Sequence, residues 1–132
     1  MIALDTNVIV RLLVNDDAAQ ARRARTLLAQ EREVRIPVTV LLEAEWVLRS
    51  AYGYPAPQVM TFLRAMLGLP GVSTENAPAV AAAMTACDRG LDFADALHIA
   101  LSGEAAHFYT FDANLRRRAP RAMPGVQVSA PG

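Results

Sequence analysis

The chain begins Met-Ile-Ala-Leu-Asp-Thr-Asn-Val-Ile-Val-Arg-Leu-Leu-Val, residues 1–14, and this stretch decides the fold. The apolar run from Ile2 to Leu4 predicts a buried strand, and the apolar residues that resume at helical spacing after Asn7 predict a helix. Asp5 therefore falls at the carboxyl end of a strand, where open α/β sheets place their ligand sites. One interpretation of Asp5 is a helix N-cap. The other is a metal ligand, which requires carboxylate partners from elsewhere in the chain.

Length and composition favour a single domain, residues 1–132, with enough apolar sequence to bury a core. No apolar run is long enough to span a membrane. The one cysteine, Cys87, excludes an internal disulfide and a cysteine-rich zinc site. Because Met1 leads straight into the first strand, we expect no signal peptide and a cytoplasmic protein.

The net charge gives no indication of nucleic-acid binding, since 13 basic and 13 acidic residues give a formal net charge of zero. Every basic residue is arginine. Arginine is a good bidentate phosphate ligand, but codon bias explains its use more simply. The absence of lysine argues against P-loop nucleotide binding and Schiff-base chemistry.

Helices and strands alternate along the rest of the chain, separated by turns rich in polar residues, proline or glycine. Helices are predicted at residues 18–31, 38–51, from the entry at 54–57 to about 67, between the cap Asn76 and Gly90, at 93–103 and at 113–118. Strands are predicted at residues 34–36, 72–74, 107–110 and 126–128. This alternation predicts an α/β fold, a three-layer α/β/α sandwich around a mainly parallel sheet.

Two more aspartates resemble Asp5 in their setting. Asp112 follows the strand predicted at residues 107–110, and two aspartates at the carboxyl ends of neighbouring parallel strands would face one crevice. Asp95 lies in the first turn of an apolar helix. Asp92 is best interpreted as the cap of that helix, whereas small and apolar neighbours surround Asp95, so we expect Asp95 to point into the structure or a cleft.

Two glutamates, Glu43 and Glu45, lie in the apolar stretch predicted as the helix 38–51. A charge in such a stretch needs a partner. Positions two apart on a helix face different directions, so one acid can meet solvent while the other points inward. Spacing alone does not choose between them.

Acids gathered in one cleft repel one another unless they are protonated or bind a cation. Carboxylates without a required histidine or thiol suit a hard divalent ion, Mg²⁺ or Mn²⁺. Such sites bind phosphate esters and activate water. The sequence therefore predicts a divalent metal site that acts on phosphate esters.

Four segments, taken in order, resemble the PIN domain and, more closely, the VapC toxins of bacterial and archaeal toxin–antitoxin pairs. They are Leu4-Asp5-Thr6-Asn7, Leu41-Leu42-Glu43 followed by Trp46-Val47-Leu48, Phe93-Ala94-Asp95-Ala96-Leu97-His98, and Thr110-Phe111-Asp112. Each segment is weak alone, but their order and spacing cover nearly the whole chain. The family acid precedes the tryptophan-like position by three, so the resemblance selects Glu43. It assigns four residues to an acidic pocket: Asp5, Glu43, Asp95 and Asp112.

This resemblance implies an Mg²⁺- or Mn²⁺-dependent ribonuclease that hydrolyses RNA phosphodiester bonds. It also implies inhibition by a small antitoxin protein and a homodimer. Asp5 and Asp95 would hold the main cation, and Glu43 and Asp112 would complete the pocket and help to position the attacking water.

Residues around the acids receive lesser roles. Thr6 and Asn7 would steady the Asp5 turn behind the ligands. Three arginines after Asp112 either contact RNA phosphates or form a solvated helix face: Arg116, Arg117 and Arg118. Four further residues are expected to be structural or inert: His98, His107, Trp46 (in the core or a dimer contact) and Cys87.

Three alternatives stay open. A PIN nuclease without a toxin role, for example in RNA processing, would lack a short antitoxin gene beside its own. A phosphotransfer enzyme or receiver domain is disfavoured, because Asn7 stands where a second aspartate is needed and the chain has no lysine. A non-enzymatic PIN-fold binding module is disfavoured because all four acids are present.

Overall fold

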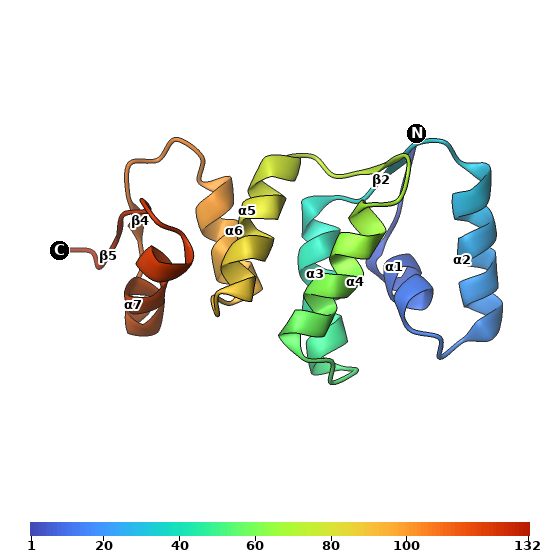
Figure 1. The fold of residues 1–132 in the computed structure, drawn as a ribbon, viewed down its shortest axis with the longest axis horizontal. Coiled ribbons are helices and arrows are strands. Elements are labelled where there is room, and N and C mark those ends of the chain that lie inside the picture. Colours follow the sequence, from blue (N-terminus) through green and yellow to red (C-terminus); the bar gives the residue numbers. More distant parts are fainter. The chain divides into compact units, whose positions relative to one another are not determined.

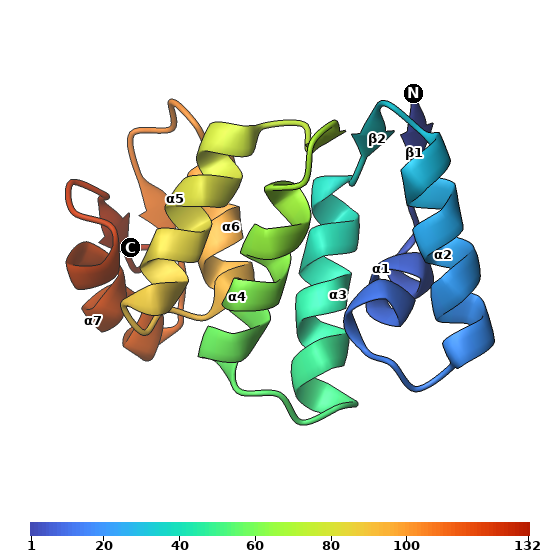
Figure 2. The same ribbon diagram turned by 45° about the vertical axis from the view of Figure 1, so that its right-hand side comes forward.

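The computed structural model describes all residues, 1–132. The chain divides into two compact units, Met1–Asn76 and Ala77–Gly132, and each is described by itself. Figure 1 and Figure 2 show the elements of each unit from two directions. None of the helices has the length and apolar character needed to cross a membrane.

The first unit is built on a parallel three-stranded sheet with the order β1-β2-β3. Its strands are β1 (Ile2–Ala3), β2 (Val34–Arg35) and β3 (Val72–Ser73). Its helices are α1 (Thr6–Leu13), α2 (Ala18–Gln30), α3 (Val38–Ser50) and α4 (Ala56–Leu67). Helix α1 packs against both α2 and α3, and α3 packs against α4 (Figure 1).

Apolar residues at helical spacing hold this unit together. Ile9, Leu41, Leu48 and Leu63 are completely buried, and full burial of such a side chain contributes about 1.5–3 kcal/mol. Gly71 has a φ of 80°, and a Cβ there would lie 2.0 Å from the Arg32 carbonyl oxygen. Only glycine fits this close approach, which lets the Gly71 carbonyl accept the Val34 N–H and align β3 with β2.

The second unit carries a parallel pair of strands, β4 (Phe108–Tyr109) and β5 (Val128–Ser129). Its helices are α5 (Ala77–Asp88), α6 (Phe93–Leu101) and α7 (Ala113–Ala122). Helix α5 packs along α6 (Figure 2), and the buried side chains include Val80, Phe93 and Leu97.

The α/β class and the parallel pairing predicted from the sequence are confirmed, since every strand pair is parallel. The prediction of a short helix ending at Arg118 was wrong. Helix α7 continues through Pro120 to Ala122, because the buried residues Leu115, Ala119 and Ala122 hold one face of the helix against the unit. A proline costs a helix one hydrogen bond, and this packing offsets it.

The last strand was also misplaced. It was predicted at residues 126–128, but β5 covers Val128–Ser129. The Val126 N–H donates to the Met123 carbonyl at 3.2 Å, so Val126 belongs to the turn that follows α7.

Candidate active site

Asp5 lies immediately after β1 and caps α1. Its Oδ1 accepts the Thr6 backbone N–H at 2.8 Å, and its side chain is exposed. The N-cap interpretation is therefore confirmed. Capping engages only one of the two carboxylate oxygens, so it leaves Asp5 able to bind a ligand as well.

Glu43 of α3 is tied to the same turn. The Thr6 hydroxyl donates a short hydrogen bond to Oε1 of Glu43, and Thr6 itself is buried. One threonine thus joins two acids from distant parts of the sequence, through its backbone N–H to Asp5 and through its hydroxyl to Glu43.

Asp5 and Glu43 line one pocket of about 250 Å³ in the first unit. The other lining residues are Thr6, Asn7, Val10, Arg11, Val47 and Tyr52. The side chains that reach this pocket therefore come from the β1–α1 turn, from α1, and from α3 and the residues just after it. A pocket with two carboxylates and a hydroxyl offers the oxygen ligands that Mg²⁺ and Mn²⁺ prefer.

The structure distinguishes Glu43 from Glu45, which their spacing in the sequence could not do. Glu45 is only 1% exposed and forms an ion pair with Arg49, whose Nη2 lies 3.1 Å from Oε1 of Glu45. Glu43 is exposed and lines the pocket. Glu45 is therefore engaged within α3, and Glu43 is the acid that accompanies Asp5.

The acids of the second unit gather at the start of α6 and α7. Asp92 caps α6 by accepting the Asp95 N–H at 3.2 Å, which confirms its predicted capping role. Asp112 caps α7 by accepting the Leu115 N–H at 3.1 Å, and the Asp112 N–H donates to the Thr110 hydroxyl at 3.1 Å.

Asp95 is half-buried, in keeping with the prediction that it points into the structure or a cleft. Burial raises the pKa of Asp95, and the neighbouring charges of Asp92 and Asp112 raise it further, while His98 lowers it. A negative charge at Asp95 is thus opposed from two sides, and a cation would relieve that repulsion.

The structure brings together Asp5 with Glu43 in the first unit and Asp95 with Asp112 in the second. Within neither unit do three or more His, Cys, Asp or Glu side chains converge as a metal site. Strand β1 belongs to the first sheet and β4 to the second. The four-carboxylate pocket stays a prediction.

The arginines after Asp112 differ from one another. Arg116 donates to the Thr110 carbonyl at 3.1 Å, and Arg117 donates to the Asn114 side chain at 2.8 Å. Arg118 is exposed on α7. Arg116 therefore braces the turn that carries Asp112, which is a role that the sequence did not suggest.

Two of the residues expected to be structural lie at the surface, and for Trp46 the dimer contact stays a prediction. Trp46 is 58% exposed, so it does not lie in the core. His98 is exposed one turn after Asp95, and its charge acts on the Asp95 pKa. His107 stacks on Tyr109 with a ring separation of 5.7 Å, as suits a structural residue.

Sequence reasoning missed a network around Arg11. Arg11 donates to Gln20 at 2.8 Å, to Asp16 at 3.0 Å and to Tyr52 at 3.1 Å, and the Tyr52 hydrogen bond raises the Arg11 pKa. The network links α1 to α2 and to the residues after α3. The one available signal was the position of Arg11, a helical turn after Asn7 on α1.

A parallel α/β architecture with carboxylates at strand ends suits a hydrolase that uses divalent metal ions. Comparison with known families agrees: the PIN domain matches residues 2–120, and the chain belongs to this family. The chain therefore has a nuclease fold from a family that is generally metal-dependent, which supports a hydrolase acting on nucleic acid. A comparison with curated proteins found no match.

Proposed function

We propose that this chain is an Mg²⁺- or Mn²⁺-dependent endoribonuclease that acts as the toxin of a toxin–antitoxin pair. The observation that carries the proposal is the pairing of Asp5 and Glu43 through Thr6 at the carboxyl end of β1. In a chain of the PIN domain family, this pairing supports a role for both acids in phosphodiester hydrolysis.

Residues 1–132 form one PIN-like domain in this proposal, and Asp5, Glu43, Asp95 and Asp112 act in one acidic pocket. The family match supports the single domain, because residues 2–120 span both units. The donor chemistry supports the metal. All four acids offer hard oxygen ligands, no arginine side chain pairs with Asp5 or Glu43, and the neighbours of Asp95 oppose its charge.

Asp5 and Asp95 would hold the ion, with Glu43 and Asp112 completing the pocket. When bound, the ion supplies charge stabilisation at the phosphate and lowers the pKa of water. Thr6 keeps one oxygen of Glu43 occupied, so the other is left to orient the attacking water. Asn7, which lines the same pocket, would support the Asp5 turn.

The partners in this proposal are RNA, a cognate antitoxin protein and a second copy of the chain in a cytoplasmic homodimer. The resemblance of the four sequence segments to VapC toxins supports the antitoxin and the dimer. The exposure of Trp46 on α3 supports a protein contact there, since exposed aromatic side chains are enriched at interfaces.

The test is RNA cleavage by purified, antitoxin-free protein with Mg²⁺, with Mn²⁺ and with EDTA, alongside Asp5→Asn. Asp5→Asn keeps the shape of the α1 cap but removes a ligand charge, so we expect cleavage to fall by about 10³-fold, as at other sites that lose a charge-stabilising group. EDTA should abolish cleavage by the unaltered protein.

The matched control is Asp17→Asn. Asp17 caps α2 by accepting the Gln20 N–H at 3.0 Å, and it does not line the pocket of Asp5. Cleavage that survives EDTA or Asp5→Asn would overturn the proposed chemistry. Neither cleavage nor metal binding by the folded protein would favour the non-enzymatic module.

A further inference from the structure

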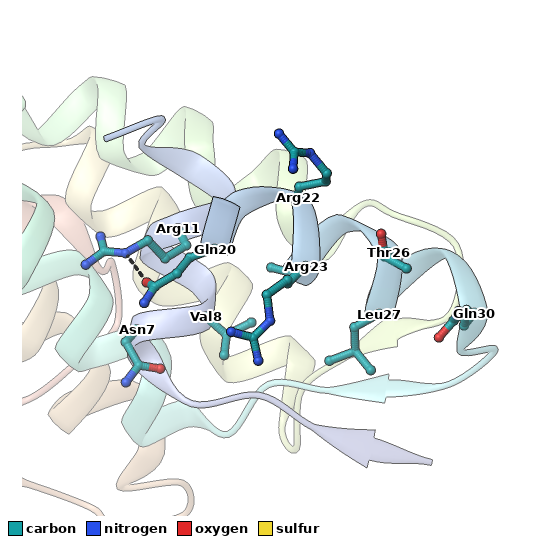
Figure 3. A pocket seen from close by; sticks show the side chains of 10 residues that line it. Asn7, Val8, Arg11, Gln20, Arg22, Arg23, Thr26, Leu27 and Gln30 are labelled. Carbon is teal, nitrogen blue, oxygen red and sulfur yellow. Dashed lines mark hydrogen bonds between the residues drawn. The ribbon is translucent and has the colours of Figure 1, made fainter. Parts of the chain in front are cut away.

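The first unit contains a larger hollow of about 800 Å³ between α1 and α2. Ten residues line it: Asn7, Val8, Arg11, Gln20, Arg22, Arg23, Ala24, Thr26, Leu27 and Gln30. We call it the α1–α2 groove. Figure 3 shows Arg23 reaching from α2 toward Val8 of α1.

The α1–α2 groove is basic. Three arginines line it and no acid does. Arg11 is paired with Asp16, whereas the side chains of Arg22 and Arg23 make neither a hydrogen bond nor an ion pair. Two cations are thus available to an incoming anion, and arginine matches the geometry of a phosphate.

The groove adjoins the pocket of Asp5 and Glu43. Asn7 and Arg11 line both hollows, and the hydrogen bond from Arg11 to Gln20 fixes α2 beside α1 (Figure 3). A ligand that lies in the groove would therefore extend toward the acids.

We propose that the α1–α2 groove binds the RNA strand beside the bond to be cut, with Arg23 contacting a backbone phosphate. This inference rests on the proposed function. A basic track that leads to an acidic site is what a polyanionic substrate needs, because the arginines supply the attraction that the carboxylates do not.

The lining favours a single RNA strand over a docked protein helix. Only Val8, Ala24 and Leu27 are apolar, whereas an amphipathic helix needs a continuous apolar stripe in its groove. The amide side chains of Gln20 and Gln30 can hydrogen-bond to the edges of unpaired bases or to a ribose 2′-hydroxyl.

The experiment measures binding and cleavage separately. Binding of a fluorescein-labelled single-stranded RNA is followed by anisotropy in EDTA over a range of KCl concentrations, and cleavage is followed with Mg²⁺. We expect Arg23→Gln to weaken binding by about five- to tenfold and to reduce the slope of log affinity against log salt by about 0.7, the value for one phosphate on a single strand. KM should rise with kcat nearly unchanged.

Arg25→Gln is the matched control, because Arg25 is exposed on the same helix but does not line the groove. It should bind RNA as the unaltered protein does. Arg23→Lys should keep the salt slope while losing part of the affinity, since it keeps the charge but not the fork of donors. Melting temperatures of all variants establish that they are folded.

Each outcome decides between the two proposals. If Arg23→Gln and Arg25→Gln bind RNA equally well and RNA is still cut, the groove does not bind RNA, and the proposed ribonuclease activity stands. A specific loss of binding in a protein that never cuts RNA would keep the groove and overturn the nuclease. If the unaltered protein and both variants fail to bind RNA, the proposed RNA-binding role of the groove is wrong. It is also wrong if Arg23→Gln binds RNA normally but loses its complex with the antitoxin.

Discussion

The two units treat their acids differently. In the first, Thr6 supplies a hydrogen-bond donor to each acid, so the side chains of Asp5 and Glu43 are held in place. In the second, burial and two neighbouring carboxylates raise the pKa of Asp95. The first unit therefore orients its acids, and the second opposes the negative charge of Asp95. An acidic metal site requires both properties, since ligands must be oriented and metal binding must be favoured over protonation.

The same contrast exists within α3. Glu43 and Glu45 are two positions apart, yet one lines the pocket of Asp5 while the other is buried against Arg49. Chemically identical side chains can thus line a pocket or form a buried ion pair, according to the helix face on which they lie.

Of the changes that test these two contrasts, the largest effect is expected from replacing Glu43 with glutamine. Glu43→Gln should lower cleavage by about 100-fold or more, because glutamine still accepts the Thr6 hydroxyl but lacks the charge. Its free energy of unfolding should stay within about 0.5 kcal/mol of the unaltered protein. Single-turnover RNA cleavage and urea unfolding measure the two quantities.

Glu45→Gln should show the reverse pattern. Removing the charge from a buried ion pair should lower the free energy of unfolding by about 1–3 kcal/mol, while cleavage per folded molecule is retained. If Glu45→Gln loses cleavage as completely as Glu43→Gln, Glu45 also takes part in the site and the assignment by helix face is wrong.

A smaller effect is expected from replacing Thr6, the residue that hydrogen-bonds to both Asp5 and Glu43. Thr6→Val keeps the shape of the side chain but removes the hydroxyl donor, which frees Glu43 to rotate away. Cleavage should fall by about 10- to 100-fold, the range for residues that orient metal ligands. Thr6→Ser keeps the donor and should keep most of the activity, so equal activities of the valine and serine variants would show that the hydroxyl has no positioning role.

Much of the fold could be predicted from the sequence because its signals are local. The strand end at Asp5 and the cap Asp92 depend on neighbouring residues alone, and the structure has both of them in place. The length of α7 could not be predicted, since Pro120 is tolerated only through burial of the opposite helix face.

The site was harder to predict because it depends on how helices pack. The sequence pattern left Glu43 and Glu45 equivalent, and family resemblance favoured Glu43 before the Thr6 contact gave a physical reason. The α1–α2 groove gave no sequence signal, because Arg23 and Asn7 come together only when α2 lies against α1. The sequence left two positions open for Trp46, the core or a dimer contact, because an aromatic residue beside an apolar stripe can be buried or exposed, and its exposure excludes the core.

The smallest expected effect concerns the charge at Asp95. Its pKa in the folded protein is raised above the ordinary value of 3.8, so protonated Asp95 favours folding and that stability is lost as the pH rises through the folded pKa. Asp95→Asn should therefore raise the melting temperature at neutral pH in EDTA. Asp95 is only half-buried and is therefore partly screened by solvent, so we expect a rise of at most about 2 °C. The difference should vanish below the unfolded pKa, where the acid is neutral in both states.

Three charged groups act on Asp95, and they make the sign of this shift informative. Asp92 and Asp112 oppose its charge, while His98 supports it. Glu104→Gln, an exposed change in the same unit, provides the control and should leave the melting temperature unchanged. Adding Mg²⁺ should stabilise the unaltered protein more than Asp95→Asn, because a cation is favoured most where negative charge is least compensated. A lower melting temperature for Asp95→Asn in EDTA would mean that His98 and the α6 N-terminus already compensate the charge, and the contrast between the two units would then disappear.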